Sequence, residues 1–311
     1  MKAVESSNYS PIKHKEVSEP FNKLSSPLYV AAIDIGTNST HLLIASINPL
    51  LRTFSIQLAE KSTTRLGELD PESGDLTELA MQRVIDTLKR FKQLASSYNV
   101  SQLVTAATSA VREAPNGREF LIRIKDSLQI DVDLISGAEE ARLIYLGVLS
   151  GISFGDKPHI IIDIGGGSTE LILADNKDAR ALTSTKIGAV RLQRDFIKKE
   201  PISNQRLFFL KTFIQGSLEP AVEKIIRRIN LNEEPVLVAT SGTAMAIGTL
   251  IAYEGGSSSI RLQSYKISKK QVSKLLQKLL LLTPEDRKKL PSLSERRSEI
   301  IVPGSLILES T

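Results

Sequence analysis

The strongest constraint on the fold of this 311-residue chain is a short stretch that occurs twice. Residues 159–170 read HIIIDIGGGSTE, and residues 32–40 read AIDIGTNST. An offset of 129 residues aligns Asp34 with Asp163, Gly36 with Gly165, Ser39 with Ser168 and Thr40 with Thr169. A further pair, residues 104–109 (VTAATS) and 236–241 (VLVATS), matches at an offset of 132 residues. Two pairs at nearly the same offset indicate a duplicated domain rather than a short tandem repeat.

The repeated stretch has the chemistry of an anion site. Residues 160–164 are aliphatic except for Asp163, which predicts a strand covered on both faces. Residues 165–167 are glycines, so no Cβ atom keeps the backbone away from an anion, and successive free N–H groups in such a turn form an anion-binding concavity. A plain hairpin turn is the alternative, because residues 170–174 read as a returning strand. The second copy favours the phosphate site.

Residues 240–243 offer another phosphate platform. Residues 235–239 predict a strand, which delivers the sequence TSGT into a helix that is expected to begin near Ala244. At such a position the backbone N–H groups and the helix dipole are directed at the same point.

Composition excludes several classes of site. The chain has no cysteine and only three histidines, His14, His41 and His159, so disulfides, thiolate sites and a histidine metal cluster are not expected. No segment is long and apolar enough to span a membrane, and the N-terminus lacks a signal pattern, so we expect a cytoplasmic protein.

The net charge of +5 is unevenly distributed. Residues 191–311 carry 20 Lys+Arg against 12 Asp+Glu, and residues 1–190 have a net negative charge. A basic half can attract a polyanion, although paired lysines and arginines in helical patterns are also typical of a solvated face. Aromatic residues make up 5% and do not interleave with these charges, so nucleic acid is not expected as a partner.

Hydrophobic periodicity predicts two α/β units. We expect a disordered tail at 1–28, an N-terminal domain at 29–137 and a C-terminal domain at 138–311. Each domain is predicted to be a mixed sheet with helices on its faces. The predicted strands are 29–35, 40–47, 51–59, 103–107, 131–135, 159–164, 169–174, 180–187 and 235–239, and the predicted helices are 76–97, 120–128, 136–149, 203–230 and 268–282.

Two adjacent glutamates open the helix predicted at 136–149. Ser136 followed by Glu139 three residues later is a capping-box pattern, which gives Glu139 a structural task. Glu140 has no such task. The alternative to a functional role is that Glu140 is simply an acidic residue in the first turn, where the helix dipole favours negative charge. Arg65 lies near Gly67 after a predicted strand. It could bind an anion through two hydrogen bonds, and an ordinary surface arginine is the alternative.

The combined motifs resemble the exopolyphosphatase/guanosine pentaphosphate phosphatase (Ppx/GppA) family over about residues 29–309. They are residues 33–39 (IDIGTNS), 108–114 (TSAVREA), 136–148 (SGAEEARLIYLGV), 162–170 (IDIGGGSTE) and 240–243 (TSGT). The resemblance implies two ribonuclease-H-like domains of the actin, sugar-kinase and heat-shock-chaperone superfamily, with a phosphate cleft between them. Members usually continue into a last strand, so the second sheet is expected to lack its final strand.

The resemblance implies hydrolysis of the terminal phosphoanhydride of inorganic polyphosphate with Mg²⁺ or another divalent cation. The general base is expected to be Glu140, with Glu139 the alternative and Glu113 a supporting acid. The expected metal ligands are Asp34 and Asp163, with Glu170 as a further ligand or supporting acid. The expected substrate-binding residues are Gly36, Thr37, Asn38, Ser39, Arg65, Arg112, Gly165, Gly166, Gly167, Ser168, Thr169, Ser241, Gly242 and Thr243.

Three other functions stay open at this point. A guanosine pentaphosphate 5′-phosphatase would use the same site with a nucleoside pocket, and a sugar kinase would need a sugar pocket and an adenosine-binding segment. A non-catalytic polyphosphate- or nucleotide-binding module is the third. The oligomeric state is open between monomer and homodimer.

Overall fold

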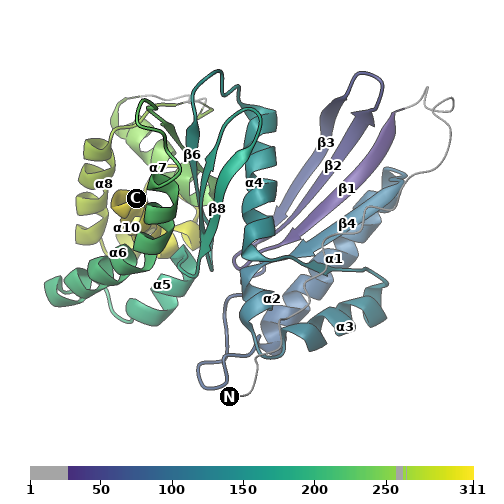
Figure 1. The fold of residues 1–311 in the computed structure, drawn as a ribbon. Coiled ribbons are helices and arrows are strands. Elements are labelled where there is room, and N and C mark those ends of the chain that lie inside the picture. The colour runs from purple at the N-terminus through teal and green to yellow at the C-terminus, as the bar shows by residue number, and fades with distance from the viewer. Residues whose placement is uncertain (1–26, 257–261, 264) are drawn as a thin grey trace, which may run out of the picture.

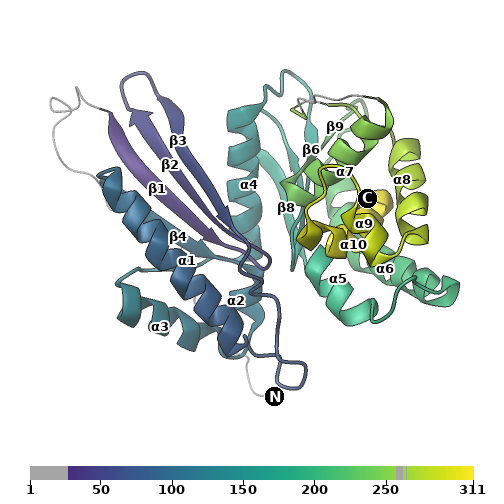
Figure 2. The same ribbon diagram turned by 180° about the vertical axis from the view of Figure 1, so that it is seen from behind.

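The computed structural model describes residues 27–256, 262–263 and 265–311. The predicted tail therefore lies outside the described residues except for its last two positions. Two β-sheets stand side by side, each with helices beside it, and helix α4 (Gly137–Gly151) lies between them (Figures 1 and 2). Within the described part of the chain, no helix combines the length and apolar character needed to cross a bilayer.

The first sheet has five strands in the order β3-β2-β1-β4-β5. They are β1 (Leu28–Ile35), β2 (Thr40–Asn48), β3 (Thr53–Ser62), β4 (Gln102–Ala107) and β5 (Asp133–Leu134). β1 pairs antiparallel with β2 and parallel with β4. One face buries Ile33, Ile35 and Leu42 together with helices α1 (Glu78–Ser97) and α3 (Gly117–Leu128). Buried and exposed residues alternate over residues 31–35 of β1 and 40–44 of β2, so the other face of the sheet is open there.

The second sheet repeats this plan with four strands in the order β8-β7-β6-β9. They are β6 (His159–Ile164), β7 (Thr169–Ala174), β8 (Ala179–Thr185) and β9 (Val236–Thr240). β6 pairs antiparallel with β7 and parallel with β9, as β1 does with β2 and β4. Among the described residues the sheet ends at β9.

Helices cover the second sheet on both faces, which explains why every residue of β7 is buried. Helix α4 packs on one face through Ala141 and Tyr145 against Ile161 and Ile172. The other face packs against α5 (Ala189–Phe196), α6 (Asn204–Ile226), α7 (Ser241–Glu254), α8 (Lys269–Leu281) and α10 (Glu295–Ser310). This division gives the second sheet two separate apolar layers.

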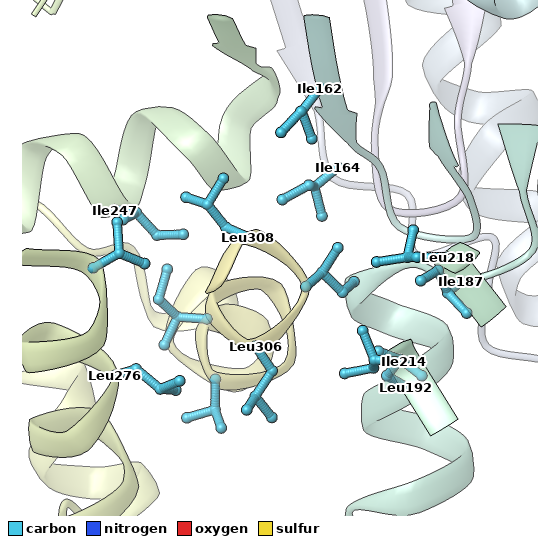
Figure 3. Packing of buried hydrophobic residues seen from close by; sticks show 14 of the residues in the cluster. Ile162, Ile164, Ile187, Leu192, Ile214, Leu218, Ile247, Leu276, Leu306 and Leu308 are labelled. Atoms are coloured by element: carbon cyan, nitrogen blue, oxygen red, sulfur yellow. The ribbon is translucent and has the colours of Figure 1, made fainter. Parts of the chain in front are cut away.

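Helix α10 runs through the middle of the larger core. Leu306 and Leu308 lie among Ile164, Leu276 and other aliphatic side chains (Figure 3). Its residues from 301 to 308 are buried on all sides, so they show no amphipathic period that could have predicted the helix. Pro303 lies inside it.

The predicted elements are present with shifted ends. The predicted strand at 131–135 is reduced to Asp133–Leu134, and the helix expected near Ala244 already begins at Ser241. Helices α2 (Ser109–Glu113), α5, α9 (Pro284–Lys288) and α10 were not predicted. Three of these are eight residues or shorter, and such lengths give too few turns for periodicity to register.

Candidate active site

The two glycine turns close with the same hydrogen bond. Gly36 N donates to Ser39 O at 3.1 Å, and Gly165 N donates to Ser168 O at 2.9 Å. A Cβ atom on Gly36 or Gly165 would lie 2.9 or 3.0 Å from that same carbonyl oxygen. Glycine is required at both positions because the turn folds back on itself.

The middle residues of the two turns pack against each other. A Cβ atom on Gly166 would lie 3.0 Å from Thr37 Cβ, and one on Gly167 would lie 2.7 Å from Thr37 Oγ1. Gly167 also faces Ser109 in α2. The glycines that the sequence predicts to admit an anion therefore also allow the turns of the two domains to approach each other.

Two aspartates lie where β1 and β6 lead into these turns. Burial raises the pKa of Asp34 to about 7, and the nearby Glu140 adds to the rise. Burial likewise raises the pKa of Asp163 to about 7, with contributions from Glu140 and Asp34. Asp34 keeps accessible surface on the open face of its sheet, yet the surrounding protein removes enough hydration to favour its neutral form.

Two glutamates complete this acidic group. Glu170 pairs with Asp163 across β6 and β7, is 1% exposed, and accepts a hydrogen bond from Ser184 Oγ at 2.7 Å. Burial raises its pKa well above the ordinary value, followed by the charges of Glu140 and Asp163. Burial also raises the pKa of Glu140, although Arg112 opposes the shift. The charge of Glu140 in α4 therefore raises the pKa of three other carboxyl groups, one each from β1, β6 and β7.

This group fits a divalent cation in part. Carboxylate oxygens are the ligands that Mg²⁺ takes, and their mutual repulsion is relieved by a cation. Among the described residues, however, no three acidic or histidine side chains are close enough together to form a ready ligand set. Mg²⁺ commonly binds through one or two carboxylates, water and substrate phosphates, which this arrangement permits.

The structure separates the three candidate glutamates. Glu140 Oε2 accepts hydrogen bonds from Arg112 Nη1 at 3.2 Å and Nη2 at 3.3 Å inside the acidic group. Glu139 N donates to Ser136 Oγ as the capping pattern predicts, while both Glu139 carboxylate oxygens accept from Arg142 at 2.7 and 2.8 Å.

Glu113 contacts both domains and lies near the acidic group. It accepts from Ser109 Oγ at 2.9 Å and from Arg191 Nη2 at 2.8 Å. Its charge contributes to the raised pKa of Glu140.

Both predicted phosphate-binding arginines have carboxylate partners. Arg65 Nη2 donates to both oxygens of Glu299 at 2.8 Å, and Arg65 Nη1 donates to Glu68 at 3.1 Å. Arg112 bridges Glu140 and Ile135 O, the latter at 2.8 Å. Each of these two guanidinium groups therefore already has a carboxylate partner within the protein.

The predicted platform at 241–243 forms the start of α7. Ser241 has φ of 85°, an unusual conformation for a residue with a side chain, and its Oγ accepts from Thr243 N at 3.2 Å. The Gly242 carbonyl accepts a hydrogen bond from Arg297 Nη1. Strain of this kind is concentrated at functional sites.

The remaining predicted residues hold the turns together. Asn38 Nδ2 donates to Ser39 Oγ at 3.4 Å, and Thr169 Oγ1 donates to Ile187 O at 2.8 Å. Ser168 and Thr169 are buried.

Sequence reasoning missed several residues at this junction. A cavity of about 300 Å³ lies beside the glycine turns, lined among others by Thr37, Ser109, Glu113, Gly167 and Arg191. Ser109 is the last residue of segment 104–109, which matches residues 236–241, and this match could have indicated it. Arg191 lies three residues after Gly188 and outside any recognisable motif.

His41, Lys61 and Arg297 also lie near the site and are not among the site residues expected from the sequence. Lys61 and Arg297 both lower the pKa of His41, after the larger effect of burial.

Known proteins resemble this chain in sequence and in fold. The Ppx/GppA phosphatase family matches residues 43–311. Exopolyphosphatase 1 of Mycobacterium leprae is 27% identical over 288 residues, which cover 91% of this chain and 82% of the relative. The guanosine-5′-triphosphate,3′-diphosphate pyrophosphatase of Photobacterium profundum is 34% identical over 246 residues, covering 79% of this chain and 48% of the relative.

Solved structures agree with these relatives. An exopolyphosphatase from Cytophaga hutchinsonii superimposes with a TM-score of 0.82 at 29% identity, covering 91% of this chain and 89% of that one. A Ppx/GppA protein from Aquifex aeolicus gives a TM-score of 0.73 at 29% identity, covering 92% and 90%. The sequence resemblance and the expected two-domain fold are thereby confirmed, and the chain belongs to the Ppx/GppA phosphatase family.

Proposed function

We propose that this protein hydrolyses the terminal phosphoanhydride bond of inorganic polyphosphate and releases orthophosphate. The observation that carries the proposal is the group formed by Asp34, Asp163, Glu140 and Glu170 beside two glycine turns. Such a group can hold a cation and a water molecule against a phosphate chain. Relatives named exopolyphosphatase align over about nine-tenths of the chain.

Each part of the site has a proposed task. Asp34 and Asp163 would hold Mg²⁺, with Glu170 behind Asp163, and the cation would neutralise charge on the phosphate oxygens. Backbone N–H groups of 36–39, 165–168 and 241–243 would bind the terminal phosphates, and Arg65 and Arg112 would add positive charge.

Glu140 is the proposed general base. Its raised pKa brings proton affinity closer to working pH, where proton transfer from water is most efficient. Arg112 fixes the carboxylate orientation through Oε2. Glu139 stays the alternative, and both oxygens of its carboxylate accept hydrogen bonds from Arg142.

A guanosine pentaphosphate 5′-phosphatase is the second candidate. The relative from Photobacterium profundum is more similar by identity, at 34%, than the exopolyphosphatase from Mycobacterium leprae, although it matches less of this chain. The site chemistry is the same for both substrates, so substrate preference has to be measured.

Orthophosphate release from long polyphosphate, guanosine pentaphosphate and ATP tests the proposal. We expect kcat/KM with Mg²⁺ to be highest for polyphosphate and to vanish with EDTA. Preference for guanosine pentaphosphate would select the second candidate. ATP consumption that depends on a sugar would identify a kinase, and absence of release from all three would leave a binding module.

Three further expectations complete the proposal. We place the domain boundary between residues 137 and 138, where α4 leaves the first domain and packs on β7 and β8. The cytoplasm is the proposed location. A homodimer is the proposed alternative to a monomer, to be decided by sedimentation.

A further inference from the structure

The carbonyl groups of the second glycine turn are held from one side by the start of helix α5. The backbone N–H groups of residues 189–191 donate to Gly165 O and Gly166 O over distances of 2.9 to 3.0 Å. The side chain of Arg191 supplies the next contact, because its Nε donates to Gly167 O at 3.0 Å. Three successive carbonyls of the turn therefore point towards α5.

Peptide planarity then sets the direction of the N–H groups in this turn. In a trans peptide the C=O and the following N–H point in opposite directions, so the N–H groups of residues 166–168 are directed away from α5. Ile164 lies in the same core as Leu192 of α5 (Figure 3). Asp163 points to the opposite face of the sheet because successive residues of a strand alternate. The three N–H groups therefore face the side that carries the acidic group.

Arg191 also reaches the first domain. Its Nη2 donates to Glu113 Oε2 at 2.8 Å, and the other carboxylate oxygen of Glu113 accepts from Ser109 Oγ at 2.9 Å. The side chains of Arg191 and Glu113 are 24% and 16% exposed, so solvent screens this ion pair only in part. One guanidinium group thus joins Gly167 in the second domain to α2 in the first.

The first glycine turn is held by backbone groups. Gly67 N donates to Thr37 O at 2.8 Å, and Arg65 N donates to Asn38 O at 3.0 Å. The second turn instead uses a side chain for its last carbonyl. A substitution at Arg191 therefore removes the donor to this carbonyl while the backbone contacts of the turn remain.

We propose that Arg191 is a positioning residue, which holds the Gly167 carbonyl away from the bound phosphate and ties it to Glu113 of the first domain. This rests on the proposed function, in which N–H groups of residues 165–168 bind the terminal phosphates. Without Arg191 the peptide after Gly167 can rotate and turn its carbonyl oxygen towards the anion, which repels it. The N–H contact is made before and during the reaction, so its loss weakens binding more than turnover.

Two measurements on the purified protein test this role. Calorimetric titration with polyphosphate of defined length in EDTA reports binding without turnover, and orthophosphate release with Mg²⁺ gives kcat and KM. Arg191→Gln removes the charge and the guanidinium hydrogen bonds, so we expect about tenfold weaker polyphosphate binding and a KM raised by the same factor. The kcat value should stay within about threefold. Arg191→Lys keeps the charge and should recover part of the affinity.

Two further variants serve as controls. Lys186→Gln removes an exposed lysine that faces the same Glu113 carboxylate at 3.7 Å, and it should change affinity by less than about twofold. The double variant Arg191→Gln/Glu113→Gln should bind no more weakly than Arg191→Gln alone, because the two residues act through one ion pair. Thermal melts identify any variant that fails to fold.

Unchanged affinity and KM in folded Arg191→Gln would overturn the positioning role and leave the proposed function standing. A fall in kcat at unchanged affinity would also overturn it, since that pattern belongs to a contact made only in the transition state. An additive loss in the double variant would refute the tie to Glu113.

The wild type separates this inference from the proposed function. Polyphosphate binding without orthophosphate release would refute the proposed function, and the titration would still decide the role of Arg191 because it needs no turnover. Absence of polyphosphate binding by the wild type would refute both.

Discussion

The two sheets place equivalent rows of side chains at the glycine turns, and the rows carry different charge. In register, the first row is Asp34, His41 and Lys61, and the second is Asp163, Glu170 and Ser184. Only the aspartate is shared. The glycine turn has the same conformation in both domains. Beside it, the row of the first sheet ends in basic side chains, whereas the row of the second sheet adds a second carboxyl group.

The difference between the two rows suits them to different ligands. Glu170 is buried and adjoins Asp163, and its carboxyl oxygens are ligands of the kind that a divalent cation takes. His41 and Lys61 stand on an open face, which suits a phosphate chain. A symmetric pair of acidic rows would attract cations but repel the substrate beyond its first phosphate.

The largest effect is expected where the rows meet. Glu140→Gln should lower kcat for polyphosphate by about 10²–10⁴-fold, the range typical of a lost general base, while binding is retained. Glu139→Gln is the matched control, because its carboxylate contacts Arg142 on the helix surface. Steady-state kinetics with both variants check this. Near-normal turnover in Glu140→Gln with a collapse in Glu139→Gln would reverse the assignment.

The contact between the two turns provides the second test. Gly166→Val places bulk against Thr37, and overpacking of this kind should lower the free energy of unfolding by about 2 kcal/mol and reduce polyphosphate binding. Adding Thr37→Gly should recover part of the loss, because Thr37 occupies the space that Gly166 leaves. Urea unfolding and titration of the single and double variants measure the coupling. Equal losses with and without Thr37→Gly would show that the turns do not depend on this contact.

The glycine turns also show how far sequence reasoning reaches. The duplication and the two mixed sheets followed from residues 32–40 and 159–170, because a repeated motif fixes local conformation. The partner of Gly166 did not follow, since the contact with Thr37 joins segments 129 residues apart. The ion pair of Arg65 with Glu299 is of the same kind.

Helices posed a different difficulty. The period of α1 was visible because one face is buried and the other solvated. Helix α10 is surrounded by core, so its sequence shows no such contrast. Arg297 consequently had no predicted element to place it, and its meeting with Lys61 appears only once the second core is packed.

The third prediction makes the first row resemble the second. His41→Glu would put a carboxylate beside Asp34, as Glu170 stands beside Asp163, and should weaken polyphosphate binding by about tenfold through repulsion of the chain. His41→Gln is the neutral control and should have a smaller effect. Titrations of both variants at several salt concentrations check this, since a charge effect shrinks with salt. Equal affinity for the Glu and Gln variants would show that the charge of this row does not act on the ligand.

The smallest expected effect is on the unfolding free energy of the metal-free protein, which should depend on pH through Asp163 in the row of the second sheet. Burial and the charges of Glu140 and Asp34 raise the pKa of Asp163 to about 7 in the folded state, from an ordinary value of 3.8. Below pH 4 the carboxyl group is protonated in both states. Between these values the unfolded chain loses the proton first, so stability falls as pH rises and stays lower above pH 7.

Asp163→Asn should therefore stabilise the protein in EDTA at pH 8, with no gain at pH 4. The full rise in the pKa of Asp163 corresponds to about 4 kcal/mol of unfolding free energy. Because Asp163 keeps some contact with solvent, we expect the variant to gain about 1 kcal/mol. Urea unfolding at both pH values measures it. Mg²⁺ should invert the order at pH 8, because it stabilises the wild type by binding the carboxylate that the variant lacks. A wild type that is as stable at pH 8 as at pH 4 in EDTA, and is indifferent to Mg²⁺, would mean that the acidic row of the second sheet neither repels itself nor binds a cation.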